Sequence, residues 1–319
     1  MFLLVTNKRD LTCDFVVLEL ERRALPYFRL NTEDVASSVL TWTPDHGFQL
    51  SLRGRSFASH EIRSGYFRRP MPPEVRHPGG RSLSQYVAGE WQQVLHCLYG
   101  ALEDRWLNSP SRIQFAENKL LQLRTAINLG FDVPRTLVTN SFEEARRFVG
   151  AAGPKIAKPL RQALVVADDE ERVIFTTRLD PDTPLVPEEI RACPLILQNE
   201  IKKRLDIRAT VVGSTVFCAE IHSQTQEDTK VDWRRFSKVD LDQLPHTLPL
   251  ELQEKCVALT RTLGLRFGAI DLILDVKGDY WFLEINPNGQ WAWIEQRTAQ
   301  PIASAIVSEM ERIGDQHST

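Results

Sequence analysis

Residues 269–286, AIDLILDVKGDYWFLEIN, restrict the fold of this chain more than any other stretch. Two runs rich in β-branched and aromatic residues flank the turn-forming residues KGD at 277–279, so the pattern predicts an antiparallel β-hairpin. Pro287, Asn288 and Gly289 follow directly and are expected to end the second strand.

The register of this hairpin decides which of its side chains share a face, because side chains alternate across a strand. A two-residue loop at 278–279 places Asp271 opposite Asn286 and Ile273 opposite Glu284. Asp271, Glu284 and Asn286 then lie on one face. The other face is wholly apolar and consists of Leu272, Leu274 and Val276 against Trp281, Leu283 and Ile285. Burial of that apolar face selects this register.

Two carboxylates and an amide are thereby gathered at one end of the hairpin. Hard oxygen ligands of this kind suit Mg²⁺, which takes a few carboxylates and completes its shell with water and substrate phosphates. Asp and Asn are disfavoured in strands, which argues against a chance cluster on a solvent-facing side. The sequence therefore predicts a magnesium site at Asp271, Glu284 and Asn286.

The composition is ordinary for a globular protein, with 319 residues, 42% hydrophobic and 25% charged. This length allows two or three domains. A net charge of -3 gives no reason to expect a nucleic-acid partner. No apolar run approaches the roughly 20 residues of a membrane helix, and MFLLVTNKRD is too short in apolar residues for a signal peptide.

The five cysteines are odd in number and contain no CxxC pair, so neither a disulfide framework nor a zinc site is expected. We expect these thiols to be small core residues in a protein of the reducing cytoplasm. They are Cys13, Cys97, Cys193, Cys218 and Cys256.

Three blocks are predicted along the chain, at 1–110, 111–195 and 196–319. In the first block, the strand FLLVT, the helix CDFVVLELERRA and the strand YFRLN have the order βαβ, which favours a parallel sheet. The stretch PMPPEVRHPGGRS is rich in Pro and Gly and is expected to be a loop.

A single helix is predicted to begin at the junction with the second block. Ser109 is suited to cap it, Pro110 to occupy its first position, and Gly130 to end it. Its buried stripe, recognised by helical spacing, consists of Ile113, Ala116, Leu120, Leu123 and Ile127.

The remaining elements alternate between strands and helices. The second block continues with the strand TLVTN, the helix SFEEARRFVGAAG, the strand PKIAKPL and a hairpin over LVVADDEERVIFTT. The third block opens with the strand LILQNE, followed by the strands LDIRATVVG and STVFCAEIHS and the helix PLELQEKCVALTRTLGL.

Three motifs in this order resemble the ATP-grasp superfamily over about residues 110–310. The spaced D…ExN of the acidic hairpin resembles its metal ligands, PKIAKP at 154–159 its nucleotide lysine strand, and QNEIKKRLDIRATVVG at 198–213 its nucleotide hinge and DxR strand. The resemblance implies an α/β fold, α+β in parts, in three parts. An N-terminal parallel-sheet domain is followed by central and C-terminal domains that hold ATP between them.

The same resemblance implies roles for residues outside the hairpin. Lys119 and Lys158 would bind ATP phosphates, although each is also compatible with a solvated lysine. Asp206 would contact the ribose or the metal, and Arg208 would neutralise the transferring γ-phosphate, with a surface ion pair as the alternative. The adenine would be recognised through the main chain of Gln198, Asn199, Glu200 and Ile201.

A narrower resemblance runs over nearly the whole chain. YFRRP at 66–70, GEWQQVLHCLYGAL followed by WLNSP at 106–110, AENKLLQLRTA, and VDWRR at 231–235 resemble the peptide maturases that build microviridins and other graspetides. The resemblance implies that ATP and Mg²⁺ activate an Asp or Glu side chain of a precursor peptide as an acyl phosphate. A Ser, Thr or Lys side chain then attacks to close a macrocyclic ester or amide.

One departure concerns the loop after the lysine strand, which in many superfamily members is rich in glycine. KPLRQALVVADDEERV contains none, so phosphate binding is expected to depend on Lys119, Lys158, Arg208 and magnesium. By resemblance, the segment from about 164 to 193 docks the leader of the precursor. Glu188 and Glu189 are candidate partners of a basic leader residue, or simply favourable charges at a helix N-terminus.

Arg68 and Arg69 allow two interpretations: they hold an acidic core peptide in bidentate fashion, or they form an interdomain ion pair. The favoured function is that of an ATP-dependent macrocyclase of a precursor peptide with leader and core, in which a homodimer is one option for assembly. One alternative is a ligase that adds free amino acids, as the ribosomal-protein glutamate ligases and glutathione synthetases do. Another is a non-catalytic peptide-binding relative, against which Asp271, Lys158 and Arg208 argue.

Overall fold

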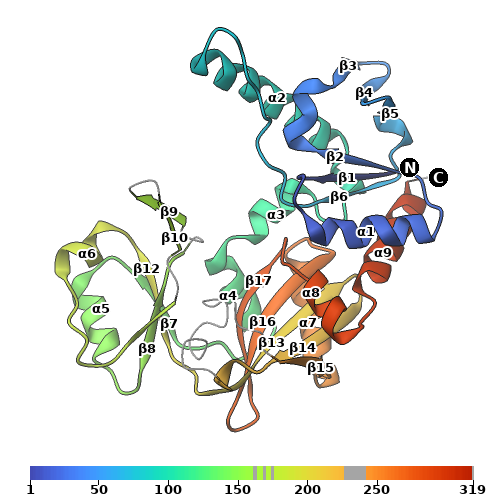
Figure 1. Ribbon diagram of the computed structural model, residues 1–319. Coiled ribbons are helices and arrows are strands. Elements are labelled where there is room, and N and C mark those ends of the chain that lie inside the picture. Colours follow the sequence, from blue (N-terminus) through green and yellow to red (C-terminus); the bar gives the residue numbers. More distant parts are fainter. Residues whose placement is uncertain (161–163, 168–169, 174–175, 226–241, 318–319) are drawn as a thin grey trace.

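The computed structural model describes residues 1–160, 164–167, 170–173, 176–225 and 242–317. The VDWRR motif at 231–235 lies outside the described residues. The chain forms three regions (Figure 1): an N-terminal region of residues 1–107, a central region of residues 136–199, and a C-terminal region of residues 110–128 and 203–317. Its fold class is the mixed α/β arrangement predicted from the sequence.

The N-terminal region is built on a parallel sheet with the strand order β2-β1-β6, as the βαβ pattern predicted. A three-stranded antiparallel sheet, β3-β4-β5, and the long helix α2 lie beside it (Figure 1). The elements are β1 (Phe2–Thr6), α1 (Leu11–Arg22), β2 (Tyr27–Asn31), η1 (Thr32–Ser37), β3 (Val39–Thr43), β4 (Gly47–Leu52), β5 (Arg55–Ala58), η2 (Ser59–Glu61), β6 (Ser64–Phe67), α2 (Arg81–Ala101) and η3 (Glu103–Arg105).

The central region is a four-stranded antiparallel sheet with the order β11-β8-β12-β7. Helices α5 and α6 cover one of its faces, and the other face turns toward the C-terminal region (Figure 1). A separate antiparallel hairpin, β9-β10, occupies the predicted position. The elements are β7 (Thr136–Thr139), α5 (Phe142–Val149), β8 (Lys155–Lys158), β9 (Leu164–Ala167), β10 (Glu170–Val173), β11 (Thr177–Leu179), α6 (Pro187–Ala192) and β12 (Leu195–Asn199).

The C-terminal region is a five-stranded antiparallel sheet with the order β15-β14-β13-β16-β17. Helices α4 and α7 pack on one face, whereas α8 and α9 pack on the other together with the N-terminal region. The elements are α3 (Pro110–Ala116), α4 (Lys119–Asn128), β13 (Lys203–Val212), β14 (Thr215–Ile221), η4 (Ser223–Thr225), β15 (Gln243–His246), α7 (Leu250–Thr262), β16 (Phe267–Asp275), β17 (Tyr280–Asn286), α8 (Ala292–Thr298) and α9 (Ile302–Gln316).

The predicted helix after residue 109 is two helices. Asn118 caps the second one by accepting hydrogen bonds from the amides of Leu120 and Leu121, so α4 restarts with a new phase. Leu120 and Ile127 are consequently 49% and 59% exposed, and their assignment to the buried stripe was wrong. Ile113, Ala116 and Leu123 are buried as expected.

The packing divides the chain at other places than the expected domain limits of 110 and 195. Helix α4 contacts β17 and shares its core with the C-terminal sheet, although it falls in the block 111–195. Strand β12 pairs with β7 and β8 of the central sheet and continues to Asn199. The central region therefore comprises residues 136–199.

The acidic hairpin forms with a register that differs from the prediction. Asp271 pairs with Glu284, and a β-bulge at Leu283 then shifts the pairing, so that Leu272 lies opposite Phe282. Phe282 is buried, and the assignment of Leu283 and Trp281 to the apolar face was wrong. The predicted sharing of one face by Asp271, Glu284 and Asn286 survives, because the bulge lies beyond them.

The hairpin loop is also longer than two residues. The Asp275 side chain accepts hydrogen bonds from the amides of Lys277 and Asp279 at 2.8 and 2.9 Å, which stabilises a wider turn. Val276 is carried into this turn and is 55% exposed rather than part of the apolar face.

The five cysteines carry free thiols. Cys13, Cys218 and Cys256 are core residues, whereas Cys97 and Cys193 are exposed, so the expectation of five core thiols was wrong for these two. Burial raises the pKa of Cys13 and Cys218 to about 12. None of the helices in the described ranges has the length and apolar character needed to cross a bilayer.

Candidate active site

The centre of the site is a buried ion pair between two neighbouring strands. Arg208 of β13 and Asp271 of β16 are cross-strand partners, and their side chains are about one tenth exposed or less. The Arg208 Nε lies 2.6 Å from Asp271 Oδ1, and its Nη2 lies 3.3 Å from Oδ2. This fork-to-carboxylate arrangement fixes the plane of the guanidinium.

The second carboxylate of the predicted metal set also has a cationic partner. Glu284 Oε2 accepts from Lys119 Nζ at 2.8 Å, and Lys119 is the first residue of α4. Asn286 accepts from the amide of Asn288 at 2.9 Å, which bends the chain directly after β17. Carboxylate and amide oxygens and cationic side chains are thus interleaved at one face of the sheet.

Two carboxylates and one amide on a common face fit the ligand preference of Mg²⁺. Within the described residues, no group of three or more His, Cys, Asp or Glu side chains is arranged to hold a metal ion. A magnesium site on this face therefore depends on the amide oxygen of Asn286 in addition to Asp271 and Glu284.

Asp206 lies on the same face of β13 as Arg208, two residues before it, as predicted. It is buried and accepts from Lys203 Nζ at 3.0 and 2.9 Å and from the hydroxyl of Ser223. Lys203 was not anticipated as its partner. Asp206 therefore sits in a polar network beside the Arg208–Asp271 pair.

The central region contributes Lys158 and Gln198 from the face that turns toward the C-terminal sheet (Figure 1). Gln198 is 0% exposed and donates to the Thr136 hydroxyl at 2.8 Å, whereas its amide oxygen has no hydrogen-bond partner in the part of the chain that the structure describes. A buried amide oxygen without a partner is costly, and the role of Gln198 in nucleotide binding stays a prediction.

The segment 198–201 differs in one detail from the expectation that its main chain binds adenine. The amides of Asn199 and Glu200 donate to the carbonyls of Arg135 and Pro154 at 2.9 and 3.0 Å. These two amides are therefore engaged within the protein. An adenine would have to contact other main-chain atoms of the segment, such as those of Ile201, so that assignment stays a prediction.

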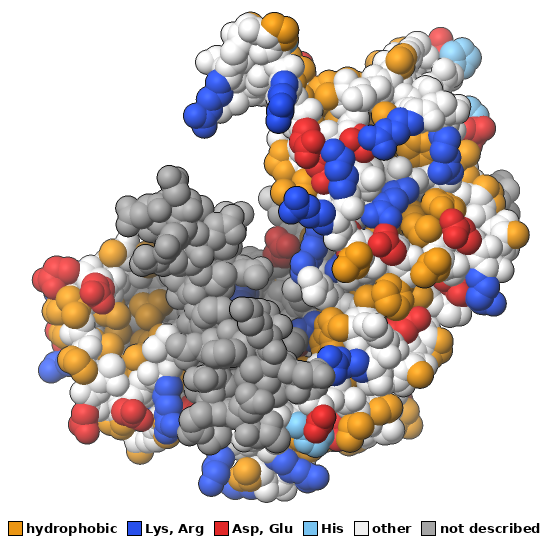
Figure 2. All heavy atoms as spheres, viewed as in Figure 1, with side chains coloured by type: hydrophobic (Ala, Val, Ile, Leu, Met, Phe, Trp, Pro, Cys, Tyr) orange, Lys and Arg blue, Asp and Glu red, His pale blue; other side chains and the backbone are white. Residues whose placement is uncertain are grey.

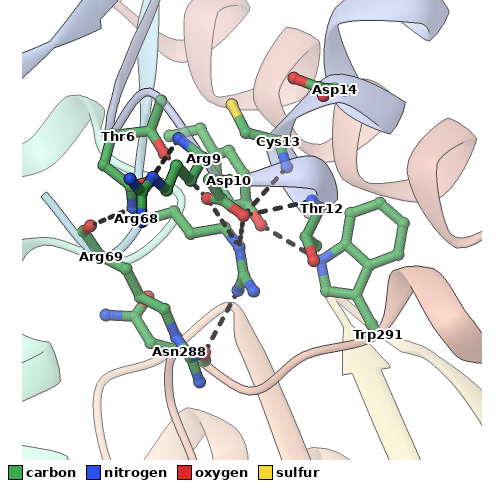
Figure 3. Close-up of polar contacts among 12 residues, drawn as sticks. Thr6, Arg9, Asp10, Thr12, Cys13, Asp14, Arg68, Arg69, Asn288 and Trp291 are labelled. Atoms are coloured by element: carbon green, nitrogen blue, oxygen red, sulfur yellow. Dashed lines mark hydrogen bonds and ion pairs between the residues drawn. The ribbon is translucent and has the colours of Figure 1, made fainter.

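Arg68 lies between the N-terminal and C-terminal regions (Figure 3). Its guanidinium contacts Asp10 at 3.1 Å and donates to the carbonyls of Asn288 and Gly289 at 3.2 and 3.0 Å. Its side chain is 1% exposed. The ion pair with Asp10 lies within the N-terminal region, so the expectation of an interdomain ion pair was wrong for Arg68, which joins the two regions through its hydrogen bonds to the two carbonyls.

Arg69 has a different environment from its neighbour. It is exposed (Figure 3), its φ is 44°, and its carbonyl accepts a hydrogen bond from the Asn7 side chain at 2.7 Å. Desolvation, the positive charge of Arg68 and, more weakly, that of Arg208 lower the pKa of Arg69. The contact of Arg69 with a peptide carboxylate stays a prediction.

Glu188 and Glu189 occupy the first turn of α6 and are exposed. Val186 at the N-cap provides no side-chain hydrogen bond to that turn. Both interpretations, a contact for a basic peptide residue and a favourable charge at the helix N-terminus, remain compatible with this position.

Two positioning residues were missed at the sequence level. Gln122 of α4 is buried and exchanges hydrogen bonds with the backbone of Ile285 at 2.9 and 3.1 Å, as a neighbouring strand would. Asn108 bridges the carbonyls of Phe267 and Pro287 at 2.8 and 3.0 Å.

Comparison with known protein families gives one match within this chain. The model of the RimK-like ATP-grasp domain matches residues 116–310. This range includes α4, the central region and the sheet that carries Arg208 and the acidic hairpin. No curated protein sequence matches the chain.

Several solved structures are similar over nearly the whole length. The Chryseobacterium gregarium RiPP-associated ATP-grasp ligase, in complex with ADP and a leader and core peptide, has a TM-score of 0.87 at 27% identity, covering 99% of this chain and 96% of that chain. The macrocyclase MdnC of Microcystis aeruginosa MRC, bound with its precursor peptide MdnA, has a TM-score of 0.83 at 26% identity, with 98% and 99% covered. The macrocyclase MdnB of the same organism has a TM-score of 0.77 at 31% identity, with 97% and 98% covered.

Proposed function

The chain belongs to the RimK-like ATP-grasp family, and from this premise we propose that it is an ATP- and magnesium-dependent macrocyclase of a ribosomally made precursor peptide. It forms esters or amides between Asp or Glu and Ser, Thr or Lys side chains of that peptide. The observation that carries this proposal is the interleaved face of Arg208–Asp271 and Lys119–Glu284, in a chain similar over its whole length to peptide-modifying ATP-grasp proteins.

The proposed reaction has two steps. A peptide carboxylate attacks the γ-phosphorus of ATP, and ADP leaves, so that the carboxylate becomes an acyl phosphate. A peptide hydroxyl or amine then attacks the acyl carbon, loses its proton and expels inorganic phosphate. Each closed ring therefore lowers the mass of the peptide by one water.

The residues of this chain act mainly by position and charge. Arg208 is held flat by Asp271 and is assigned to stabilise charge on the phosphate that is being transferred. Lys119 is placed by the start of α4 to bind phosphate oxygens beside Glu284. Asp271, Glu284 and Asn286 would hold Mg²⁺, which neutralises phosphate charge when bound.

The acidic character of the substrate also suits the N-terminal region. Figure 2 shows Lys and Arg side chains gathered on this region where it borders the hollow below α2. Arg69 lies on the same region and is exposed. We assign Arg69 to the carboxylate of the core peptide before that carboxylate is activated.

The leader of the precursor is assigned to the segment from about 164 to 193, with Glu188 and Glu189 as contacts of a basic leader residue. Binding energy from this remote segment would help to organise the reacting groups. Deleting the leader is expected to reduce turnover strongly, whereas equal turnover of a leaderless peptide would refute the assignment. The charge-reversed pair Glu188→Lys and Glu189→Lys tests the acidic contact separately.

The function is tested by mass spectrometry of a candidate precursor peptide after incubation with this protein, ATP and Mg²⁺. Loss of one water mass per ring supports the macrocyclase. A gain of amino-acid residue masses when free amino acids are supplied indicates the alternative ligase. Binding without any mass change indicates the non-catalytic alternative. The variant Arg208→Ala is the matched control for contaminating activity.

A further inference from the structure

Side chains from outside hold most of the loop between β17 and α8, residues 287–291. Its first four residues, 287–290, directly follow the predicted metal ligand Asn286. Their four successive carbonyls each accept a hydrogen bond from a side chain outside the loop. The donors are Asn108 to Pro287 at 3.0 Å, Arg68 to Asn288 at 3.2 Å and to Gly289 at 3.0 Å, and Arg208 to Gln290 at 3.3 Å.

Arg68 supplies two of these four bonds, and it comes from the N-terminal region (Figure 3). Its charge is buried and is balanced by Asp10, whose own carboxylate is fixed by the Thr6 hydroxyl at 2.8 Å. Asp10 is also the N-cap of α1 and accepts from the amides of Thr12 and Cys13. Asp10 therefore fixes the guanidinium of Arg68 in one orientation, and the guanidinium donates to the loop as a preorganised fork.

The opposite side of the loop is restrained by steric contact. A Cβ on Gly289 would lie 2.3 Å from the Cβ of Ala269, which is the cross-strand partner of Asn286. The loop is thus confined between Ala269 on one side and Arg68 on the other. Few backbone paths satisfy both conditions, and each path sets the direction in which Asn286 and the carbonyl of Gln290 point.

We infer that Asp10 and Arg68 are positioning residues of the active site, through which the N-terminal region sets the geometry of the magnesium face. Arg68 acts on Asn286 through the carbonyls of Asn288 and Gly289, and on Arg208 through the next carbonyl in the loop. This inference rests on the proposed function only where it names magnesium. The confinement of the loop by Arg68 is independent of what the enzyme makes.

The first test uses Arg68→Lys and Asp10→Asn with a matched control pair. Arg63 and Asp315 also join the N-terminal region to the C-terminal region, at 2.6 Å, but they lie away from the loop. Arg63→Lys and Asp315→Asn therefore repeat the same chemical changes at another interdomain contact. Hydrogen exchange of residues 284–292 is measured without nucleotide or metal, together with the Tm of each variant.

We expect faster exchange in this segment for Arg68→Lys and Asp10→Asn, because lysine cannot span the carboxylate and both carbonyls. The control variants should exchange like the wild type. Titration with Mg²⁺ in the presence of ADP should show binding about tenfold to a hundredfold weaker for the two loop variants, the usual effect of losing the support of a metal ligand. Exchange and Mg²⁺ affinity equal to those of the controls would overturn the inference.

A second test perturbs the loop from the other side, in case the Arg68 variants fold poorly. Gly289→Ala should weaken Mg²⁺ binding, and adding Ala269→Gly should restore it by removing the steric conflict. Unchanged affinity in Gly289→Ala would also overturn the inference. Neither measurement needs a peptide, so loop effects in a protein that fails to cyclise any precursor would refute the proposed function and leave the positioning role intact.

Discussion

The N-terminal and C-terminal regions share a core, whereas the central region has a core of its own. Phe2 and Tyr66 of the N-terminal sheet pack in one cluster with Phe267, Trp291 and residues of α9. Among the described residues, the cluster around Phe148 in the central region takes its members only from residues 137–197. Two regions far apart in sequence thus form one body, and the region between them forms another (Figure 1).

This difference divides the groups that we propose to bind the nucleotide between two bodies. Arg208, Lys119 and Asp271 belong to the body with the shared core, whereas Lys158 and Gln198 belong to the central region. We expect the central region to move as a unit about residues 130–135 and 199–203 when ATP binds, which is a common mode of closure around a ligand. We call the N-terminal and C-terminal regions together the fixed body and the central region the moving body. The chemical step would then depend on the fixed body, and the retention of ATP on the moving body.

The largest expected effect tests whether the two bodies unfold separately. Trp291→Ala and Phe148→Ala each remove a large buried ring and should cost about 3–5 kcal/mol locally. All seven tryptophans lie outside residues 136–199, so tryptophan fluorescence does not report on the central region, whereas circular dichroism reports on both bodies. Phe148→Ala should add an early transition seen only by circular dichroism, and Trp291→Ala should lower the fluorescence midpoint. If both probes showed the same early transition in Phe148→Ala, the two bodies would unfold as one unit.

The next effect concerns catalysis by the fixed body. Arg208→Ala should reduce kcat by about a hundredfold or more, about 3 kcal/mol, because its contact strengthens as charge develops on the transferring phosphate. Arg208→Lys should recover part of this loss, since lysine keeps the charge without the planar fork. Arg204→Ala on the same strand is the exposed control. A raised KM for ATP with nearly normal kcat would make Arg208 a ground-state binding residue.

A smaller effect is expected from the moving body. Lys158→Ala should raise the KM for ATP about tenfold, about 1.5 kcal/mol, because a charged contact with phosphate is lost. The kcat at saturating ATP should change much less than in Arg208→Ala. Lys277→Ala, in the exposed hairpin loop, is the control for loss of a lysine charge. If Lys158→Ala lowered kcat as strongly as Arg208→Ala, the division of roles between the bodies would be incorrect.

The comparison also shows which features could be predicted from the sequence. The βαβ order and the shared face of Asp271, Glu284 and Asn286 depend on local alternation and spacing, which the chain displays directly. The pairing register of the hairpin depended on the loop length, which Asp275 changed by accepting hydrogen bonds from loop amides. The shared face survived because the bulge at Leu283 lies outside the three ligands.

The support of the site could not be predicted, because it consists of contacts between residues far apart in sequence. Asp10 reaches the loop after Asn286 only through Arg68, and Asn108 reaches the same loop from the linker before α3. No spacing rule connects these positions. Arg68 was singled out by its motif, but its burial against two carbonyls required the packing of α9 and the N-terminal sheet.

The smallest expected effect concerns the surface contact between α1 of the N-terminal region and α9 of the C-terminal region. Glu19 accepts from Arg22 and Arg23, each at 2.7 Å, and Arg23 also pairs with Glu311 of α9 at 2.6 Å. The hydrogen bond from Arg22, assisted by Arg23, lowers the pKa of Glu19 to about 2. Because the folded pKa lies below the unfolded value, the stabilisation is complete above pH of about 4.5 and is lost as the pH falls toward 2.

Glu19→Gln should therefore lower the free energy of unfolding by about 1 kcal/mol or less at neutral pH. The difference in the free energy of unfolding between wild type and variant is measured by urea unfolding with tryptophan fluorescence. This difference should be the same at neutral and at mildly acidic pH. It should then narrow as Glu19 becomes protonated in both states of the wild type. Glu143→Gln on α5, whose exposed pair with Arg146 lies within the central region, should leave the fluorescence midpoint unchanged. A difference in unfolding free energy for Glu19→Gln that stayed constant into the acid range would mean that the charge of the Glu19 carboxylate does not stabilise the contact between α1 and α9.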